Sequence, residues 1–248
     1  MENRGKSIAI AGVAVAILAM GLVGCIQPST GLSFSQRSMV RLNAPQATQL
    51  GPGERIFDVA FEESIQKYGP IIRKYSEKYD LDWRLVVAVI RQESSFRPDA
   101  KSRKGAYGLM QIMPGTQAEL AKKLGVPEAK SPYYNIKAGM YHLHSLTRYF
   151  KEAPGEDRRT LALAAYNAGL ARVRDAQEIV RYLGGDPYRW DDVREALKLL
   201  SSDNSTLHQR VWAEGRPKGG TFKGWPETVN YVENIEQYYE GYKLLALR

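Results

Sequence analysis

The segment that most constrains this chain is Leu85-Val86-Val87-Ala88-Val89-Ile90, which is apolar on nearly every face when it is wound into a helix. A helix that is apolar all round has to be buried on all sides. Asp82 is a suitable N-cap, and Pro98 stops the helix soon after the polar sequence Arg91-Gln92-Glu93-Ser94-Ser95. The pattern therefore predicts a core helix near 82–93 with a carboxylate at its C-terminal end.

Helical patterns also dominate the rest of the chain from Arg55 onward, and strand patterns are sparse. The residues Phe61, Ile65, Tyr68 and Ile72 recur at helical spacing, with Gly69-Pro70 as an expected kink or break. Further helices are expected near 115–124, 134–151, 158–168, 171–183, 191–201 and 226–245. We therefore predict one mostly α-helical domain over residues 55–248, with little β structure. The stretch 184–223 is harder to interpret, because its tryptophans and the following Trp225 could either border a cleft or pack inside.

The N-terminus has the layout of a secretory signal. Arg4 and Lys6 precede an apolar run from Ile8 to about Met20, and Leu22-Val23-Gly24-Cys25 follows. This ending resembles the lipobox of bacterial lipoproteins, which implies a signal peptide over 1–24 and a lipidated Cys25 as the first mature residue. The alternative is an uncleaved anchor, since a membrane span needs about 17–25 residues and the apolar run is near that lower limit. Residues 25–54 are rich in Pro and Gly and predict a flexible tether.

Composition narrows the chemistry that is open to the chain. The single cysteine excludes an intramolecular disulfide. His142 and His144 are two residues apart and point in different directions on a helix, so they could not share a metal ion, and we expect no metal site. We also expect no cofactor. The formal net charge of +8 suits an anionic partner. No nucleic-acid-binding motif is present and the signal exports the chain, so a nucleic-acid partner is not expected.

Glu93 is the strongest candidate for a catalytic residue. Burial penalises its charged form, and the negative end of the helix dipole acts in the same direction. A carboxylic acid that stays protonated near neutral pH can protonate a leaving oxygen. The alternative is an ordinary solvated glutamate beside Arg91 or Arg97.

Three further segments accompany this helix. In the first, residues 93–116, Gly105 and Gly108 permit tight turns, and Gln111 is a polar residue in an apolar run that needs either protein or ligand partners. The second, residues 164–169, reads Ala-Ala-Tyr-Asn-Ala-Gly and ends a helix. The third, residues 226–232, reads Pro-Glu-Thr-Val-Asn-Tyr-Val and begins one.

Together these segments form the pattern ES … GLMQIMP … AYNAG … ETVNYV. This pattern resembles the catalytic domain of family 1 lytic transglycosylases, the soluble-lytic-transglycosylase (SLT) type with a lysozyme-like fold. The resemblance covers roughly residues 60–245. The part after Tyr166 is most similar to the C-terminal domain of membrane-bound lytic transglycosylase F.

The resemblance implies a role for each matched residue. Glu93 corresponds to the catalytic acid and base, with Ser94 in a supporting role. Tyr231 corresponds to a tyrosine that positions the catalytic group. Cleft positions that hold the sugars correspond to Ser102, Gly108, Gln111, Met113, Tyr166, Asn167 and Glu227. For three of these residues a purely structural role is equally open: Gly108 could only turn the chain, Met113 could only pack, and Tyr231 could only belong to a core stripe with Ile235, Tyr238 and Tyr242.

The resemblance also implies a reaction. Glu93 would cleave the bond between N-acetylmuramic acid (MurNAc) and N-acetylglucosamine (GlcNAc) in peptidoglycan and leave a 1,6-anhydro-MurNAc end, without water or metal. The alternatives are a goose-type lysozyme, in which water attacks, and a non-catalytic peptidoglycan-binding lipoprotein. The expected location is the cell envelope. Because Ile26 follows Cys25 rather than the aspartate of inner-membrane lipoproteins, the outer membrane is expected if the source is Gram-negative.

Overall fold

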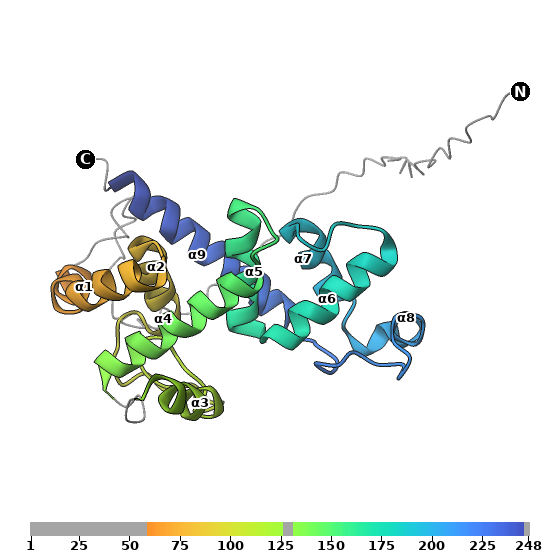
Figure 1. Ribbon diagram of the computed structural model, residues 1–248, viewed down its shortest axis with the longest axis horizontal. Helices are drawn as coiled ribbons and strands as arrows, with labels where there is room; N and C mark the ends of the chain where they lie inside the picture. The colour runs from red at the N-terminus through yellow and green to blue at the C-terminus, as the bar shows by residue number, and fades with distance from the viewer. Residues whose placement is uncertain (1–58, 126–130, 246–248) are drawn as a thin grey trace, which may run out of the picture. The chain divides into compact units, whose positions relative to one another are not determined.

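The computed structural model describes residues 59–125 and 131–245. The predicted signal peptide, Cys25 and the tether lie outside the described residues. Within the described ranges the chain is α-helical with no strand, as predicted (Figure 1). Two isolated β-bridges join Tyr107 to Lys101 and to Ile112. The helices are α1 (Val59–Tyr79), α2 (Trp83–Ser94), α3 (Pro114–Leu124), α4 (Pro132–Tyr149), α5 (Gly155–Ala168), α6 (Leu170–Leu183), α7 (Trp190–Lys198), a 3₁₀ turn (Ser202–Asn204), α8 (Ser205–Val211) and α9 (Trp225–Leu245).

Helix α2 is the buried helix that the sequence predicts. Every residue from Leu85 to Ile90 is buried. The side chain of Asp82 caps the helix by accepting a hydrogen bond of 2.9 Å from the backbone N–H of Arg84. Helix α2 packs on α1 and α9, and α5 packs on α4, α6 and α9. The core therefore surrounds the helix that carries Glu93 and fixes where its C-terminal end lies.

Helix α1 excludes a break at Gly69-Pro70, one of the two outcomes expected there, because Pro70 lies inside the helix and does not end it. A proline inside a helix removes one backbone hydrogen bond and costs about 3 kcal/mol. Burial offsets this cost, since Tyr68 lies two residues before Pro70 and Ile72 and Tyr75 lie after it, all of them in the core. Tertiary packing on both sides of the proline holds the two halves as one helix.

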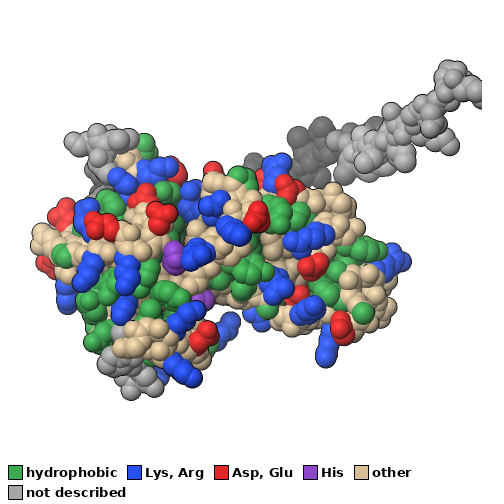
Figure 2. Space-filling view, in the orientation of Figure 1, with side chains coloured by type: hydrophobic (Ala, Val, Ile, Leu, Met, Phe, Trp, Pro, Cys, Tyr) green, Lys and Arg blue, Asp and Glu red, His purple; other side chains and the backbone are tan. Residues whose placement is uncertain are grey.

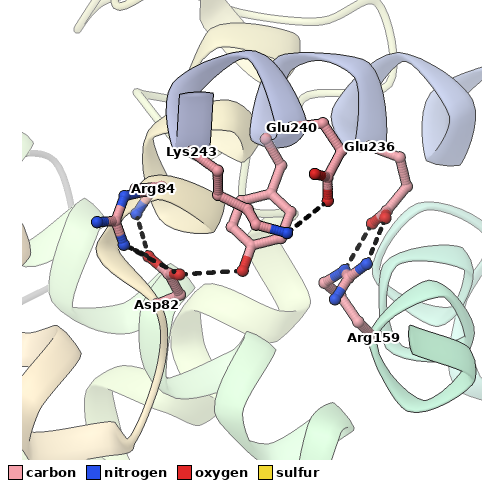
Figure 3. A network of polar contacts seen from close by, with 7 residues as sticks. Asp82, Arg84, Arg159, Glu236, Glu240 and Lys243 are labelled. Atoms are coloured by element: carbon pink, nitrogen blue, oxygen red, sulfur yellow. Dashed lines mark hydrogen bonds and ion pairs between the residues drawn. The ribbon is translucent and has the colours of Figure 1, made fainter. Parts of the chain in front are cut away.

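Figure 3 shows two side-chain contacts that connect α9 to the rest of the core and one that is local to it. Arg159 of α5 donates to both carboxylate oxygens of Glu236, at 2.8 and 2.6 Å. The hydroxyl of Tyr239 donates to Asp82, the N-cap of α2, at 3.0 Å. The pair Lys243–Glu240 is exposed and local to α9. Because bidentate pairs fix geometry as well as adding energy, the first contact sets the position of α9 along α5, and the second ties it to α2.

The stretch 184–223 contains a helix, α8, that the sequence pattern did not predict. Trp190 and Trp212 are buried, so these tryptophans pack inside. Trp225 is half-buried at the first position of α9, with the Lys198 ammonium 5.2 Å from its ring centroid. No helix in the described ranges is long and apolar enough to cross a membrane.

Candidate active site

Glu93 lies in the last turn of α2, where the chain leaves the helix sharply. Ser95 and Phe96 both take the left-handed conformation, with φ of 49° and 61°. Side chains other than glycine rarely adopt this region, so something has to hold it. The ring of Phe96 is buried against Phe61, with the ring centroids 5.5 Å apart. Ser94 is also buried, and its hydroxyl donates to the carbonyls of Ile90 and Leu109. The helix end is thus fixed to the core and to the loop that follows.

The carboxyl group of Glu93 is half-buried and accepts a hydrogen bond of 2.7 Å from the hydroxyl of Tyr231. Burial raises the pKa of Glu93 from 4.5 to about 7, and the bond from Tyr231 offsets part of that rise. Among the residues that the structure describes, no second carboxylate contributes to the shift. A group with this pKa can give up a proton and take one back near neutral pH.

Two tyrosines lie near this carboxyl group, Tyr231, which is buried, and Tyr166, which is partly buried. Burial raises the pKa of Tyr166 and of Tyr231 well above the ordinary value, and the negative charge of Glu93 adds to both shifts. Both phenols therefore stay protonated and act as hydrogen-bond donors. Tyr231 is only 5% exposed, so it belongs to the core stripe of α9 and contacts Glu93 at the same time. Tyr231 therefore packs in the core stripe and also donates a hydrogen bond to the carboxyl group of Glu93.

One wall of the site is the loop between α2 and α3. Gly108 has a φ of +83°, and a Cβ atom there would lie 2.5 Å from Nδ2 of Asn135. Asn135 is fully buried; its oxygen accepts from the backbone N–H of Met110 at 2.8 Å, and its nitrogen donates to the carbonyl of Tyr107 at 2.9 Å. Gly108 therefore does more than turn the chain, because only a glycine lets Asn135 hold this loop.

The sequence-predicted residues of this loop differ in their surroundings. The amide nitrogen of Gln111 donates to the carbonyls of Ala100 and Gly108, both at 2.9 Å, so it holds the loop. The hydroxyl of Ser102 accepts from the backbone N–H of Ala106 at 3.0 Å and closes a turn. Met113 is 42% exposed at the start of α3, which excludes packing in the core as its main role.

The opposite wall comes from the end of α5 and the start of α9. The hydroxyl of Tyr166 donates to the carbonyl of Met110 at 2.8 Å and joins the two walls. Asn167 is exposed, and its side-chain oxygen accepts a bond of 2.7 Å from the hydroxyl of buried Thr228. Glu227 is exposed in the first turn of α9, four residues before Tyr231 and so on the same face of that helix. The structure thus joins Tyr166 and Tyr231 to Glu93 electrostatically and brings Asn167 to the start of α9.

Sequence reasoning missed Asn135 and did not single out Thr228. Asn135 is a polar residue on the same helix face as Gly139 and Leu143, which are buried. A polar side chain on an apolar helix face is a usable signal, because it has to find partners inside. His142 and His144 are both half-buried, and in the described part of the chain no group of three His, Cys, Asp or Glu residues could hold a metal ion.

Residues 70–187 match the family model described as Transglycosylase SLT domain. Membrane-bound lytic murein transglycosylase F of Vibrio campbellii is 35% identical over 75% of this chain and 32% of its own length. The protein of the same name from Pasteurella multocida is 38% identical over 72% of this chain and 34% of its own length. The chain therefore spans about a third of the length of these curated relatives.

One solved structure has a similar fold. The complex of the 70-kDa soluble lytic transglycosylase with bulgecin A has a TM-score of 0.52 and 26% sequence identity, and the match covers 78% of this chain and 26% of that one. The lysozyme-like helical fold implied by the sequence is thus confirmed.

The glycine at position 108 yields a test of the loop wall. Gly108→Ala should lower the free energy of unfolding by about 2–4 kcal/mol, because the new methyl group displaces Asn135 and strands two buried backbone groups. Gly184→Ala is the matched control, since Gly184 has a similar φ of +80° but open space around it, and it should cost only about 1 kcal/mol. Urea unfolding of both variants measures the difference. Equal losses would contradict the proposed link between Gly108 and Asn135.

Proposed function

Because the chain carries a transglycosylase SLT domain, we propose that it is a lytic transglycosylase that cleaves the β-1,4 bond between MurNAc and GlcNAc in peptidoglycan. The observation that carries this proposal is Glu93, a half-buried carboxyl with a pKa of about 7 that is bonded to Tyr231. Glu93 lies within the part of the chain that matches the family. The curated relatives named above are lytic transglycosylases, which supports the same reaction.

In the proposed reaction Glu93 acts first as an acid. It gives its proton to the glycosidic oxygen, and the bond to the muramyl C1 breaks. The acetamido group of the substrate stabilises the positive charge that develops on the sugar. The hydroxyl of Tyr231 donates to the carboxylate that Glu93 has become, so the hydrogen bond stabilises the product of the proton transfer.

Glu93 then acts as a base. Its carboxylate takes the proton from the C6 hydroxyl of the same muramyl residue, and that oxygen attacks C1 to close a 1,6-anhydro ring. Every proton is returned and no water is consumed. Most glycosidases need two carboxylates, one of them to attack or to activate water. Here the attacking oxygen is already held on the substrate, which gives the ring closure the advantage of an intramolecular reaction.

The remaining site residues fall into two groups: those with a group that is free to contact a sugar, and those whose groups are used within the protein. Met113, Asn167 and Glu227 are exposed, and we propose that they contact the glycan directly. The nitrogen of Gln111 is used within the loop, so its side-chain oxygen is the group that we assign to an acetamido N–H. Ser102, Gly108 and Tyr166 are engaged with the backbone, and their proposed contribution is to shape the cleft.

We also propose that the protein acts at the cell envelope, where peptidoglycan lies. The names of the curated relatives describe them as membrane-bound, which supports a membrane location. The lipobox-like sequence ending in Cys25 supports a lipid anchor. Lipid anchors that carry more than one acyl chain hold proteins stably at a membrane. An outer-membrane position on the periplasmic side is the form of this proposal for a Gram-negative source.

Product analysis tests the proposed reaction. Purified sacculi digested by the wild-type protein in ¹⁸O-labelled water should release fragments that end in unlabelled 1,6-anhydro-MurNAc, one water lighter than hydrolytic products. Glu93→Gln should lower the rate at least about 1000-fold while the thermal melt is retained, because the general acid is lost. Labelled reducing ends would establish a lysozyme-type hydrolase instead. Binding to sacculi with no release by the folded wild-type protein would establish a non-catalytic binding protein.

Intact mass measurement tests the proposed anchor. The protein extracted from membranes should begin at Cys25 and carry the added mass of acyl chains. Cys25→Ser should abolish this added mass and leave the precursor uncleaved. A wild-type chain that still begins near Met1 and carries no lipid would favour the uncleaved transmembrane alternative.

A further inference from the structure

The loop between α8 and α9 carries positive charge for which the fold provides no partner. This basic loop, residues 213–224, exposes Arg216, Lys218 and Lys223 to solvent. In the part of the chain that the structure describes, none of these three cations forms an ion pair. Figure 2 shows Lys and Arg side chains projecting from the side of the molecule where α8 and this loop lie. Such a group of unpaired cations is available to an anionic ligand.

The basic loop is held in place by its backbone rather than by these side chains. Asp175 of α6 is 2% exposed and accepts from the backbone N–H groups of Lys218 at 3.2 Å and Gly219 at 2.6 Å. A Cβ atom on Gly219 would lie 3.0 Å from the backbone nitrogen of Arg172, so the loop presses directly on α6. The backbone N–H of Phe222 donates to Leu200 at 2.9 Å. The cations are therefore presented from a fixed backbone.

The basic loop is connected to the candidate active site through two helices: α6, on which it rests, and α9, which follows it. Helix α6, on which the loop rests, begins three residues after Asn167. Arg172 lies over the ring of Phe222 and donates to the carbonyl of Ala168 at 2.7 Å. Helix α9 begins directly after the loop, and Tyr231 follows Trp225 by six residues, which is about 9 Å along a helix. The basic loop is thus connected to the end of α5, which carries Asn167, through α6, and to Tyr231 through α9.

We propose that the basic loop binds the carboxylates of the peptide stem on the muramyl residue next to the scissile bond, and so makes the enzyme prefer stem-bearing glycan. This inference rests on the proposed function. The stem leaves the sugar ring at its lactyl group and carries free carboxylates, which suit cations that are fixed to one side of the cleft. Two more cations, Arg172 and Lys198, lie over aromatic rings at the base of the loop, and Lys198 is paired with Glu195. The acidic residues around the loop are Glu214, Glu227 and the buried Asp175, whose carboxylate accepts from the loop backbone. The local charge balance is therefore positive.

A charge-neutralised variant tests the proposal on two substrates. In Arg216→Gln/Lys218→Gln/Lys223→Gln, every backbone group that holds the loop remains. We expect kcat/KM on stem-bearing glycan to fall about tenfold, because several exposed ion pairs of modest strength are lost together. The rate on glycan freed of its stems by an amidase should stay within about twofold. The matched control is Lys67→Gln/Lys74→Gln/Lys78→Gln on α1, which removes the same charge from exposed positions and should leave both rates unchanged.

The outcomes separate this inference from the proposed function. If the wild-type protein forms no 1,6-anhydro ends on either substrate, the proposed function fails. If it forms them on both but the loop variant keeps the wild-type preference for stems, or loses both rates equally, the inference fails alone. An equal effect of the control variant would assign the change to net charge and overturn the inference. So would a loop variant with unchanged rates but weaker binding to vesicles of phosphatidylglycerol, which would assign the loop to a membrane surface.

Discussion

The site depends on one physical constraint, which is that the carboxyl group of Glu93 is partly removed from water. Glu93 can be half-buried only because α2 is surrounded by apolar helices and because Tyr231 supplies a donor to its oxygen. Its pKa in the folded protein is raised above the unfolded value, so the folded state gains stability from the protonated form below about pH 4.5 and loses it as the pH rises through about 7. The acid that suits catalysis is thus a cost to the fold at neutral pH, and the packing of α9 against α2 and α5 offsets that cost.

The segments around Glu93 are held mainly through backbone groups, which leaves the exposed side chains free for the substrate contacts that we propose. Asn135 holds the loop after α2 by two backbone atoms, Tyr166 reaches across to the carbonyl of Met110, and Asp175 holds the loop before α9. A site built in this way keeps its shape when a surface side chain is changed. Side chains that hold the backbone and exposed side chains that we propose contact the ligand occur on both sides of Glu93.

Much of this arrangement could be predicted where it depends on a short sequence pattern. The apolar run from Leu85 to Ile90 identified α2, and Gly169 was placed correctly as the end of α5. The contacts that make the site are not local: Tyr231 and Glu93 are 138 residues apart, and Asn135 and Met110 are 25 apart. No periodicity reports such a pairing, so the sequence could place Tyr231 in a core stripe or at the carboxyl group but could not join the two. The sequence could not decide between a kink and a break at Pro70 for a related reason, because the burial that keeps α1 continuous comes from other helices.

The most direct test of this account is the titration of Glu93 itself. Carbon-13 NMR of the protein labelled at the glutamate carboxyl carbons would follow each group, and the resonance missing in Glu93→Gln would identify the one of interest. We expect a midpoint near pH 7, which moves higher in Tyr231→Phe because the hydrogen bond that favours the charged form is gone. A midpoint near 4.5 in the folded wild-type protein, the ordinary value for a glutamate, would mean that Glu93 is charged at neutral pH and would contradict its role as the acid.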